Sequence, residues 1–264
     1  MNIEHLVSTM NRKDFSFLEK LNMSAPALVV NQNVEDGSLE YITDAVRARV
    51  ICTEEKGLSR SRNKLLENAE GDICIIGDDD VEYLDGYAEL IKRAYDEIPD
   101  ADIIAFRFTH KKGSETRARY SKIKRLRMWN ISKVASVEIT FKRNSVKNSG
   151  IAFNNNIGLG AAFPSGEENA FLADALRTGL KIYHYPETIC YAVEEHTLRD
   201  ISQTENYLVT KGAAFHCIYK GMFLPYALAF IVLKKRSLFK NVSIAKALKW
   251  MFNGRREYLK LSED

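Results

Sequence analysis

Short apolar segments with β-strand character alternate with helical segments through the first half of this chain. The strand-like segments are rich in β-branched residues and cover residues 5–9, 26–31, 49–53, 72–77 and 102–108. In the helical segments, apolar residues recur every three or four positions, over residues 58–69 and 83–98. This alternation predicts an α/β fold, in which a mostly parallel sheet is flanked by crossover helices. Ligands of such sheets bind beyond the carboxyl ends of the strands.

The second half of the chain is less regular. Residues 136–142 and 180–185 have strand character, whereas residues 148–165 are rich in Asn and Gly and predict a loop. A helix is expected to begin at Glu167, where two acidic residues suit the positive end of a helix dipole. Residues 107–127 hold nine Lys or Arg against one Glu and predict an exposed basic loop.

The C-terminal part of the chain is basic, whereas the rest is slightly acidic. Residues 201–264 hold 11 Lys or Arg against 4 Asp or Glu, and residues 1–200 hold 27 against 31. Within the basic part, residues 243–252 have the spacing of an amphipathic helix with a basic face, and residues 221–233 form an uncharged apolar run. Such a tail suits either packing on the core, as a helix kinked at Pro225, or docking on an anionic membrane surface.

Cysteine spacing and the N-terminal sequence indicate the cellular compartment in which the protein is expected. The four cysteines lack the CxxC spacing of a zinc site, and Cys52 and Cys74 lie in apolar runs. The N-terminus lacks the pattern of a secretory signal peptide. The longest uncharged apolar run has 13 residues, whereas a bilayer span needs about 20. We therefore expect a cytoplasmic protein with reduced thiols, which the basic tail would bring to the inner face of the cell membrane.

Three consecutive carboxylates, Asp78, Asp79 and Asp80, follow directly after a strongly apolar predicted strand. They fall where an α/β sheet binds its ligands. Hard divalent cations such as magnesium and manganese bind one or two carboxylates together with substrate phosphates. In an extended chain Asp78 and Asp80 point to the same side. A polar turn with a helix cap is the better explanation of an isolated acidic triplet, so it is the position after a buried strand that favours a metal site.

Two further motifs lie at predicted helix starts. GLSRSRN at residues 57–63 opens the helix before the acidic strand, and Ser and Arg side chains at a helix amino terminus are able to hold a phosphate. GEEN at residues 166–169 places Glu167 and Glu168 in the first turn of another helix, where a carboxylate could act as a general base. Taken alone, each motif is better explained by helix capping or by stabilisation of the helix dipole.

The order of these motifs resembles the glycosyltransferase family 2 type of GT-A enzymes. Strands ending in VSTMNR and VVNQ are followed by GLSRSRN, CIIGDDDV and PSGEENAFLADALRTGLKIYHYP, over about residues 3–200. The resemblance is closest to bacterial transferases that build capsule or surface polysaccharide. It implies a Rossmann-like GT-A catalytic domain over residues 1–200, with a nucleotide-binding half (1–108) and an acceptor half (109–200), and a helical C-terminal extension over residues 201–264.

The resemblance also implies residue roles. Asp78 and Asp80, with His196 in EEHTLRD, would hold a divalent metal, manganese or magnesium, that bridges the donor diphosphate. Glu168 stands at the position of the family's catalytic Asp, and Glu167 remains an alternative base. Asn31 stands where the family usually has an acid. The residues expected around the nucleotide sugar are Thr9, Asn11, Asn31, Arg62, Asn63, Asp78 and Asp79.

These roles imply an inverting transfer of a sugar from a nucleoside diphosphate sugar to a glycan or lipid-linked acceptor, with one base and no second nucleophile. Two alternatives remain. A sugar-phosphate nucleotidyltransferase would share the sheet and the metal, but the usual Gly-rich loop after the first strand is replaced here by STMNRKD. The second alternative is a non-catalytic module that binds a membrane surface. Nucleic acid is not an expected partner, because residues 107–127 contain few aromatic residues and no recognition motif.

Overall fold

The computed structural model describes residues 1–109, 120–192, 205–238 and 240–262. Within these residues, ten strands form one sheet in the order β3-β4-β2-β1-β5-β9-β7-β10-β6, and β8 pairs with β10. The strands are β1 (Ile3–Met10), β2 (Ala27–Gln32), β3 (Gly37–Ile42), β4 (Arg47–Thr53), β5 (Ile73–Asp78), β6 (Val81–Tyr83), β7 (Ile103–Thr109), β8 (Lys124–Arg125), β9 (Ile139–Lys142) and β10 (Ile182–Ala192). The helices are α1 (Leu58–Asn68), α2 (Tyr87–Glu97), α3 (Arg143–Ser149), α4 (Glu167–Arg177), α5 (Glu205–Tyr219), α6 (Phe223–Leu238) and α7 (Ile244–Leu261). Short 3₁₀ helices are η1 (Ser16–Leu21), η2 (Ile131–Lys133), η3 (Ser136–Glu138) and η5 (Lys220–Met222).

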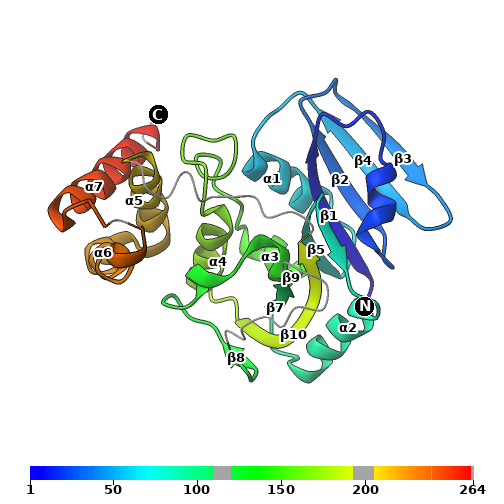
Figure 1. Ribbon diagram of the computed structural model, residues 1–264. Coiled ribbons are helices and arrows are strands. Elements are labelled where there is room, and N and C mark those ends of the chain that lie inside the picture. The colour runs from blue at the N-terminus through cyan, green and yellow to red at the C-terminus, as the bar shows by residue number, and fades with distance from the viewer. Residues whose placement is uncertain (110–119, 193–204, 239, 263–264) are drawn as a thin grey trace.

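The predicted α/β fold with helices on both faces of a sheet and a helical C-terminal extension is confirmed (Figure 1). The central strands β4, β2, β1 and β5 run parallel. In β5, Ile73 and Ile75 pack in one apolar cluster with α2 and η1, whereas Cys74 and Ile76 pack in another with α1, α3 and α4. Because successive side chains of a strand point to opposite faces, one short apolar strand contributes to both layers.

Several elements depart from the sequence prediction for local reasons. β3 is an exposed edge strand antiparallel to β4, so it lacks the buried pattern that marks a strand. α2 begins only at Tyr87, because the residues before it pair with β10 as β6. β9 begins at Ile139, after η3. The segment just after β9 forms α3, a helix that the sequence did not predict, and β10 continues to Ala192, well beyond the predicted strand.

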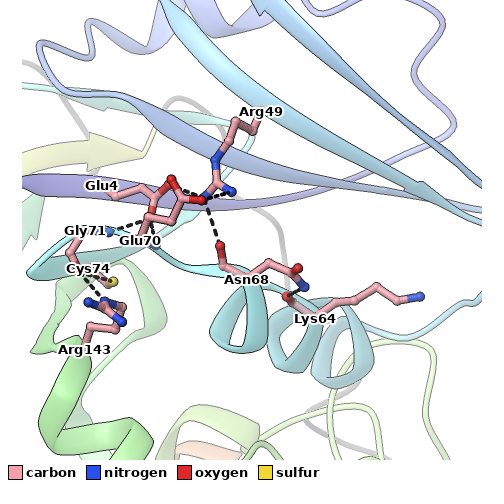
Figure 2. Close-up of polar contacts among 8 residues, drawn as sticks. All are labelled: Glu4, Arg49, Lys64, Asn68, Glu70, Gly71, Cys74 and Arg143. Carbon is pink, nitrogen blue, oxygen red and sulfur yellow. Dashed lines mark hydrogen bonds and ion pairs between the residues drawn. The ribbon is translucent and has the colours of Figure 1, made fainter.

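An ion-pair network ties β1 to β4 and to the end of α1 (Figure 2). Glu4 is 5% exposed and accepts hydrogen bonds from the backbone N–H groups of Glu70 (2.6 Å) and Gly71 (2.9 Å). Arg49 donates to Glu4 and Glu70, each at 2.8 Å, and to the carbonyl of Asn68 at 2.9 Å. A side chain at Gly71 would meet Glu4 Cβ at 2.6 Å, which explains the glycine. The network lies at the amino ends of the parallel strands, at the opposite edge of the sheet from their carboxyl ends.

Helices α5, α6 and α7 make up the C-terminal extension. Gly212 of α5 and Gly254 of α7 each face the backbone of the other helix, near Met251 and Val209 respectively, and leave no room for a larger side chain. The predicted helix over residues 243–252 is confirmed and is longer, since α7 ends at Leu261. The apolar cluster around α4 continues into all three helices, and a domain boundary near residue 200 stays a prediction.

α6 begins at Phe223, which places Pro225 in its first turn. The N–H groups of a first helical turn have no intrahelical acceptor, so a proline there breaks no hydrogen bond. The kink expected at Pro225 therefore has no cause in this structure.

Candidate active site

Three parallel strands bring polar residues to one edge of the sheet. The register of β1 with its two neighbours pairs Ser8 with Asp78 and Thr9 with Asn31. Asp78 is the last residue of β5, so the three carboxylates follow a buried strand as predicted. A cavity of about 280 Å³ opens at this edge. Its lining includes residues from the strand ends and from two loops, namely Thr9, Gln32, Leu58, Asp78, Asp79, Asp80 and Gly160.

Arg62 of α1 joins the two acidic motifs. Its side chain is 2% exposed, and its Nη2 donates to Asp78 Oδ1 at 3.1 Å while its Nη1 donates to Glu167 Oε1 at 3.0 Å. Burial acts to lower the pKa of Arg62, but the carboxylates of Asp78, Glu167 and Glu168 outweigh it and raise that pKa. The guanidinium also lies over the ring of Phe153, at 5.5 Å. Arg62 is thus a fixed positive charge between β5 and α4.

The first turn of α4 holds two glutamates in different environments. Glu167 is buried and bound to Arg62. Glu168 is half-buried. Burial and the neighbouring charge of Glu167 raise the pKa of Glu168 from its ordinary value of 4.5 to about 7, although Arg62 and Lys211 act in the opposite direction. Glu168 is therefore a carboxyl group that exchanges its proton near neutral pH, which is what a general base requires.

The C-terminal extension contributes to this site through α5. Gly166 has a φ of 101°, and a Cβ there would lie 3.0 Å from Ala214 Cβ, so α5 packs directly against the start of α4. Lys211 stands three residues earlier on α5. Its pKa is lowered by burial, which outweighs the raising effect of Glu168 and Glu167. Nothing in the local sequence marks Lys211, because its role depends on how α5 packs.

Arg12 is a second site residue that sequence reasoning missed. Its Nη2 donates to Asp79 Oδ2 at 2.9 Å and its Nε to Thr9 Oγ1 at 3.2 Å, and Thr9 Oγ1 donates to the same oxygen of Asp79 at 2.5 Å. Asn31 is 1% exposed and fixes the backbone of Arg12, since its Oδ1 accepts from the Arg12 N–H (3.0 Å) and its Nδ2 donates to the Arg12 carbonyl (2.9 Å). The signal in the sequence that could have identified Arg12 is a basic residue two positions after the end of the first strand.

Four of the residues predicted to surround the nucleotide are not part of the cavity lining, namely Asn11, Asn31, Arg62 and Asn63. Asn63 donates to the carbonyl of Phe153 at 2.9 Å and accepts from its N–H at 2.7 Å, so it fastens the loop before α4. Asn11 has a φ of 58° and accepts a hydrogen bond from Asn33 at 2.5 Å on the protein surface. His196, predicted as a metal ligand, lies outside the described residues.

The serines at the start of α1 bind protein groups. Ser59 Oγ donates to the carbonyl of Ile157, and Ser61 Oγ donates to Ser8 Oγ at 2.9 Å. Both hydroxyl protons that were expected to meet a phosphate are therefore used within the fold. In the GLSRSRN motif, Arg62 is the residue that reaches the acidic groups.

No group of three or more His, Cys, Asp or Glu side chains is arranged to hold a metal ion in the part of the chain that the structure describes. Asp78 accepts from Arg62 through one oxygen and from Ser136 through the other, at 3.1 Å each. The donor set nevertheless suits a hard cation, because three successive carboxylates line one cavity and such ions take their remaining ligands from water and phosphate. Asp80 and Asp78 are the residues that would hold it.

Comparison with known proteins decides which family this site belongs to. Residues 27–162 match the family model described as Glycosyl transferase family 2, which covers just over half of the chain. The chain belongs to glycosyltransferase family 2. The matched segment of this family 2 glycosyltransferase includes Arg62 and Asp78, and it ends shortly before Glu168. The predicted family and enzyme class are confirmed. No curated protein matches the sequence.

Solved structures share the fold of this family 2 glycosyltransferase. Residues 1–349 of S. aureus TarS in complex with UDP-GlcNAc superpose with a TM-score of 0.65 at 14% identity, covering 98% of this chain and 81% of that one. The mannosyltransferase PcManGT from Pyrobaculum calidifontis, in complex with GDP-Man and Mn2+, superposes with a TM-score of 0.53 at 12% identity, covering 98% and 87%. At these identities the likeness concerns the fold, and it confirms the predicted GT-A architecture.

Proposed function

We propose that this family 2 glycosyltransferase moves a sugar from a nucleoside diphosphate sugar to an acceptor hydroxyl with the help of a divalent metal, inverting the anomeric carbon. The observation that carries the proposal is the bridge made by Arg62. It binds Asp78 at the cavity and Glu167 at the start of α4 simultaneously, so it links the acidic strand end to the helical turn that carries Glu167 and Glu168. A transfer reaction needs the groups that bind the leaving group to lie close to the base.

The donor would occupy the cavity at the ends of β1 and β5. Arg12 offers N–H groups beside Asp79, and strand ends line the cavity, as in other nucleotide-binding α/β sheets. TarS in complex with UDP-GlcNAc and PcManGT in complex with GDP-Man share the fold, which supports a nucleotide sugar as the class of donor.

Manganese or magnesium would be held by Asp80 and Asp78. A bound ion of this kind supplies positive charge to the departing diphosphate. PcManGT was solved with Mn2+, which supports the same class of cofactor here. Arg62 adds a positive charge that does not depend on the ion, because its guanidinium is fixed by Asp78 and Glu167.

Glu168 would act as the base, and Glu167 would hold Arg62. A carboxylate of Glu168 takes the proton of the acceptor hydroxyl while the acceptor oxygen bonds to the anomeric carbon and the bond from that carbon to the diphosphate oxygen breaks. Because its pKa is about 7, Glu168 is able both to take up and to release a proton at neutral pH. A single base without a covalent intermediate gives inversion in one displacement.

We also propose that the acceptor is a glycan or a lipid-linked glycan of a bacterial surface polysaccharide, reached from the cytoplasm. The resemblance of the motif order to capsule-type transferases supports this acceptor class.

The test is a screen for release of nucleoside diphosphate from UDP-, GDP- and CDP-sugars with manganese or magnesium present. One donor class should be consumed by the wild type. Glu168→Gln should lower the transfer rate by about 10²–10⁴-fold while nucleotide binding, measured by calorimetry, is unchanged. The matched control is Glu257→Gln, an exposed glutamate on α7, which should behave as the wild type. Transfer by Glu168→Gln at the wild-type rate would refute the assignment of the base.

A further inference from the structure

The outward side of α6 is apolar from Leu224 to Leu233. The exposed positions on this arc are Leu224, Pro225, Leu228, Ala229, Val232 and Leu233. Val232 is 58% exposed and Leu233 is 78% exposed. The opposite side of the helix, formed by Phe223, Ala227 and Ile231, is buried in the protein. A helix on the surface of a soluble protein normally turns charged and polar side chains outwards, so this exposed arc indicates an interaction site.

Positive charge frames the apolar arc. Residues 206–256 contain ten Lys or Arg and no Asp or Glu. Lys220 precedes the arc on the exposed surface, Lys234 and Lys235 follow it directly, and the exposed Lys240 lies just beyond the helix. A partner for this surface must therefore accept apolar side chains at its centre and be anionic at its edges.

The surrounding helices leave α6 lying along the surface. Residues Glu205–Lys235 are long and apolar enough to cross a membrane by length and composition, and only 28% of their most apolar window is buried in the protein. In the structure the stretch folds back as a hairpin, because the ring of Phe215 lies 5.1 Å from that of Phe230, and Tyr219 stacks on Tyr226 at 3.7 Å. α5 packs against α4 and α7, and α6 lies beside α5 and α7 within the extension (Figure 1).

We propose that α6 docks this enzyme on an anionic phospholipid bilayer, with its apolar arc among the acyl chains and its flanking lysines at the level of the phosphates. Amphipathic helices that lie in a membrane interface bury one apolar face to a depth of about 5–10 Å and gain further affinity from anionic lipid. The sequence left two roles open for the apolar run of residues 221–233, packing on the core or docking on an anionic membrane surface. The exposed arc of α6 favours docking. The proposal does not depend on the reaction proposed above.

The charge pattern favours a bilayer over a second copy of the chain. In a two-fold dimer through this face, Lys234 and Lys235 of one copy would approach either the same cluster of the other copy or its Lys220, depending on whether the helices run parallel or antiparallel. Like charges across an interface repel in both cases. The arc is also only one helix wide, whereas a stable interface buries about 800 Å² on each partner. Anionic headgroups complement the lysines and place no demand on a matching protein surface.

The experiment is co-sedimentation with vesicles of phosphatidylcholine alone and with vesicles that also contain phosphatidylglycerol. The test variant is Leu228→Glu/Val232→Glu, which places two charges in the arc. The matched control is Leu39→Glu/Ile42→Glu, which places two charges on the exposed edge strand β3 at residues that are 44% and 59% exposed. A second variant, Lys235→Glu/Lys240→Glu, leaves the apolar arc intact.

Wild type and control should bind the anionic vesicles, with binding that weakens as salt is added. The arc variant should bind at least about tenfold more weakly. The lysine variant should lose about fivefold or more for each lysine, on anionic vesicles only. Equal binding by the arc variant and the control, or failure of the wild type to bind anionic vesicles, would overturn the proposal. So would sedimentation equilibrium showing a wild-type dimer that the arc variant dissociates, because the occupant of the face would then be a second copy.

Discussion

Replacing Glu168 by Gln should make the fold more stable than the wild type at alkaline pH. Burial and the charge of Glu167 raise the pKa of Glu168 from 4.5 to about 7. A carboxyl group with a raised pKa binds its proton more tightly in the folded state than in the unfolded state. Its stabilising contribution is therefore present at low pH and is lost as the pH rises through 7. Gln keeps the shape of the side chain and removes this dependence.

The magnitude follows from the two pKa values. For one group with those values, linkage gives a loss of about 2.5 kcal/mol of unfolding free energy between pH 5 and pH 8. Glu168 is half-buried, so partial exposure to solvent reduces this figure. We expect the free-energy difference between Glu168→Gln and the wild type to grow by about 1–2.5 kcal/mol over that pH interval.

The assay is urea unfolding of wild type, Glu168→Gln and the exposed control Glu257→Gln at both pH values, followed by tryptophan fluorescence. The control should stay within about 0.5 kcal/mol of the wild type at each pH. In activity assays, wild-type kcat/KM should rise between pH 6 and pH 8, as Glu168 (pKa about 7) loses its proton. A stability difference for Glu168→Gln that is the same at pH 5 and pH 8 would refute the raised pKa.

Three other variants test the contacts around the site. Arg62→Met should lower the unfolding free energy by about 3–5 kcal/mol, because it leaves the carboxylates that Arg62 binds without their buried partner. In the same urea titration, Arg60→Met, at an exposed position of the same helix, should lower it by less than about 0.5 kcal/mol. Equal losses in the two variants would contradict the ion pairs of Arg62 with Asp78 and Glu167. Asn31→Asp should cost about 1–3 kcal/mol in thermal unfolding, since the donor to the Arg12 carbonyl is lost; an unchanged midpoint would argue against that contact. Glu4→Ala should lower the unfolding free energy by about 3–5 kcal/mol. It should leave kcat of the folded enzyme unchanged, because the ion-pair network of Glu4 lies at the opposite edge of the sheet from the three aspartates. A large fall in kcat would show that the two edges are coupled.

Much of the sheet was predictable because burial on two faces is visible in the sequence as short apolar runs. β1, β2, β4, β5 and β7 each appear as such a run, and the helices between them as three- or four-residue spacing. β3 was missed because an exposed edge strand buries too little to leave a pattern. α3 was missed because it is short and polar, with Val146 as its one buried residue among those described.

The site was predictable where it follows from strand ends and was missed where it depends on packing. Asp78, Asp79 and Thr9 meet at one cavity because parallel strands end at one edge. Arg62 and Glu167 are 105 positions apart, and no local pattern shows that they bond. Lys211 reaches the site for a similar reason, through the packing of α5 on α4.

The central claim is that the cavity beside the three aspartates is the donor site. Calorimetry of a nucleoside diphosphate titrated into the wild type and into Asp80→Ala, each with manganese and with chelator, tests it most directly. We expect one binding site for each wild-type chain, with an affinity that manganese strengthens. The Asp80→Ala variant should remain folded but lose the gain from manganese. Nucleotide affinity that is the same with and without manganese, and the same in both proteins, would contradict it.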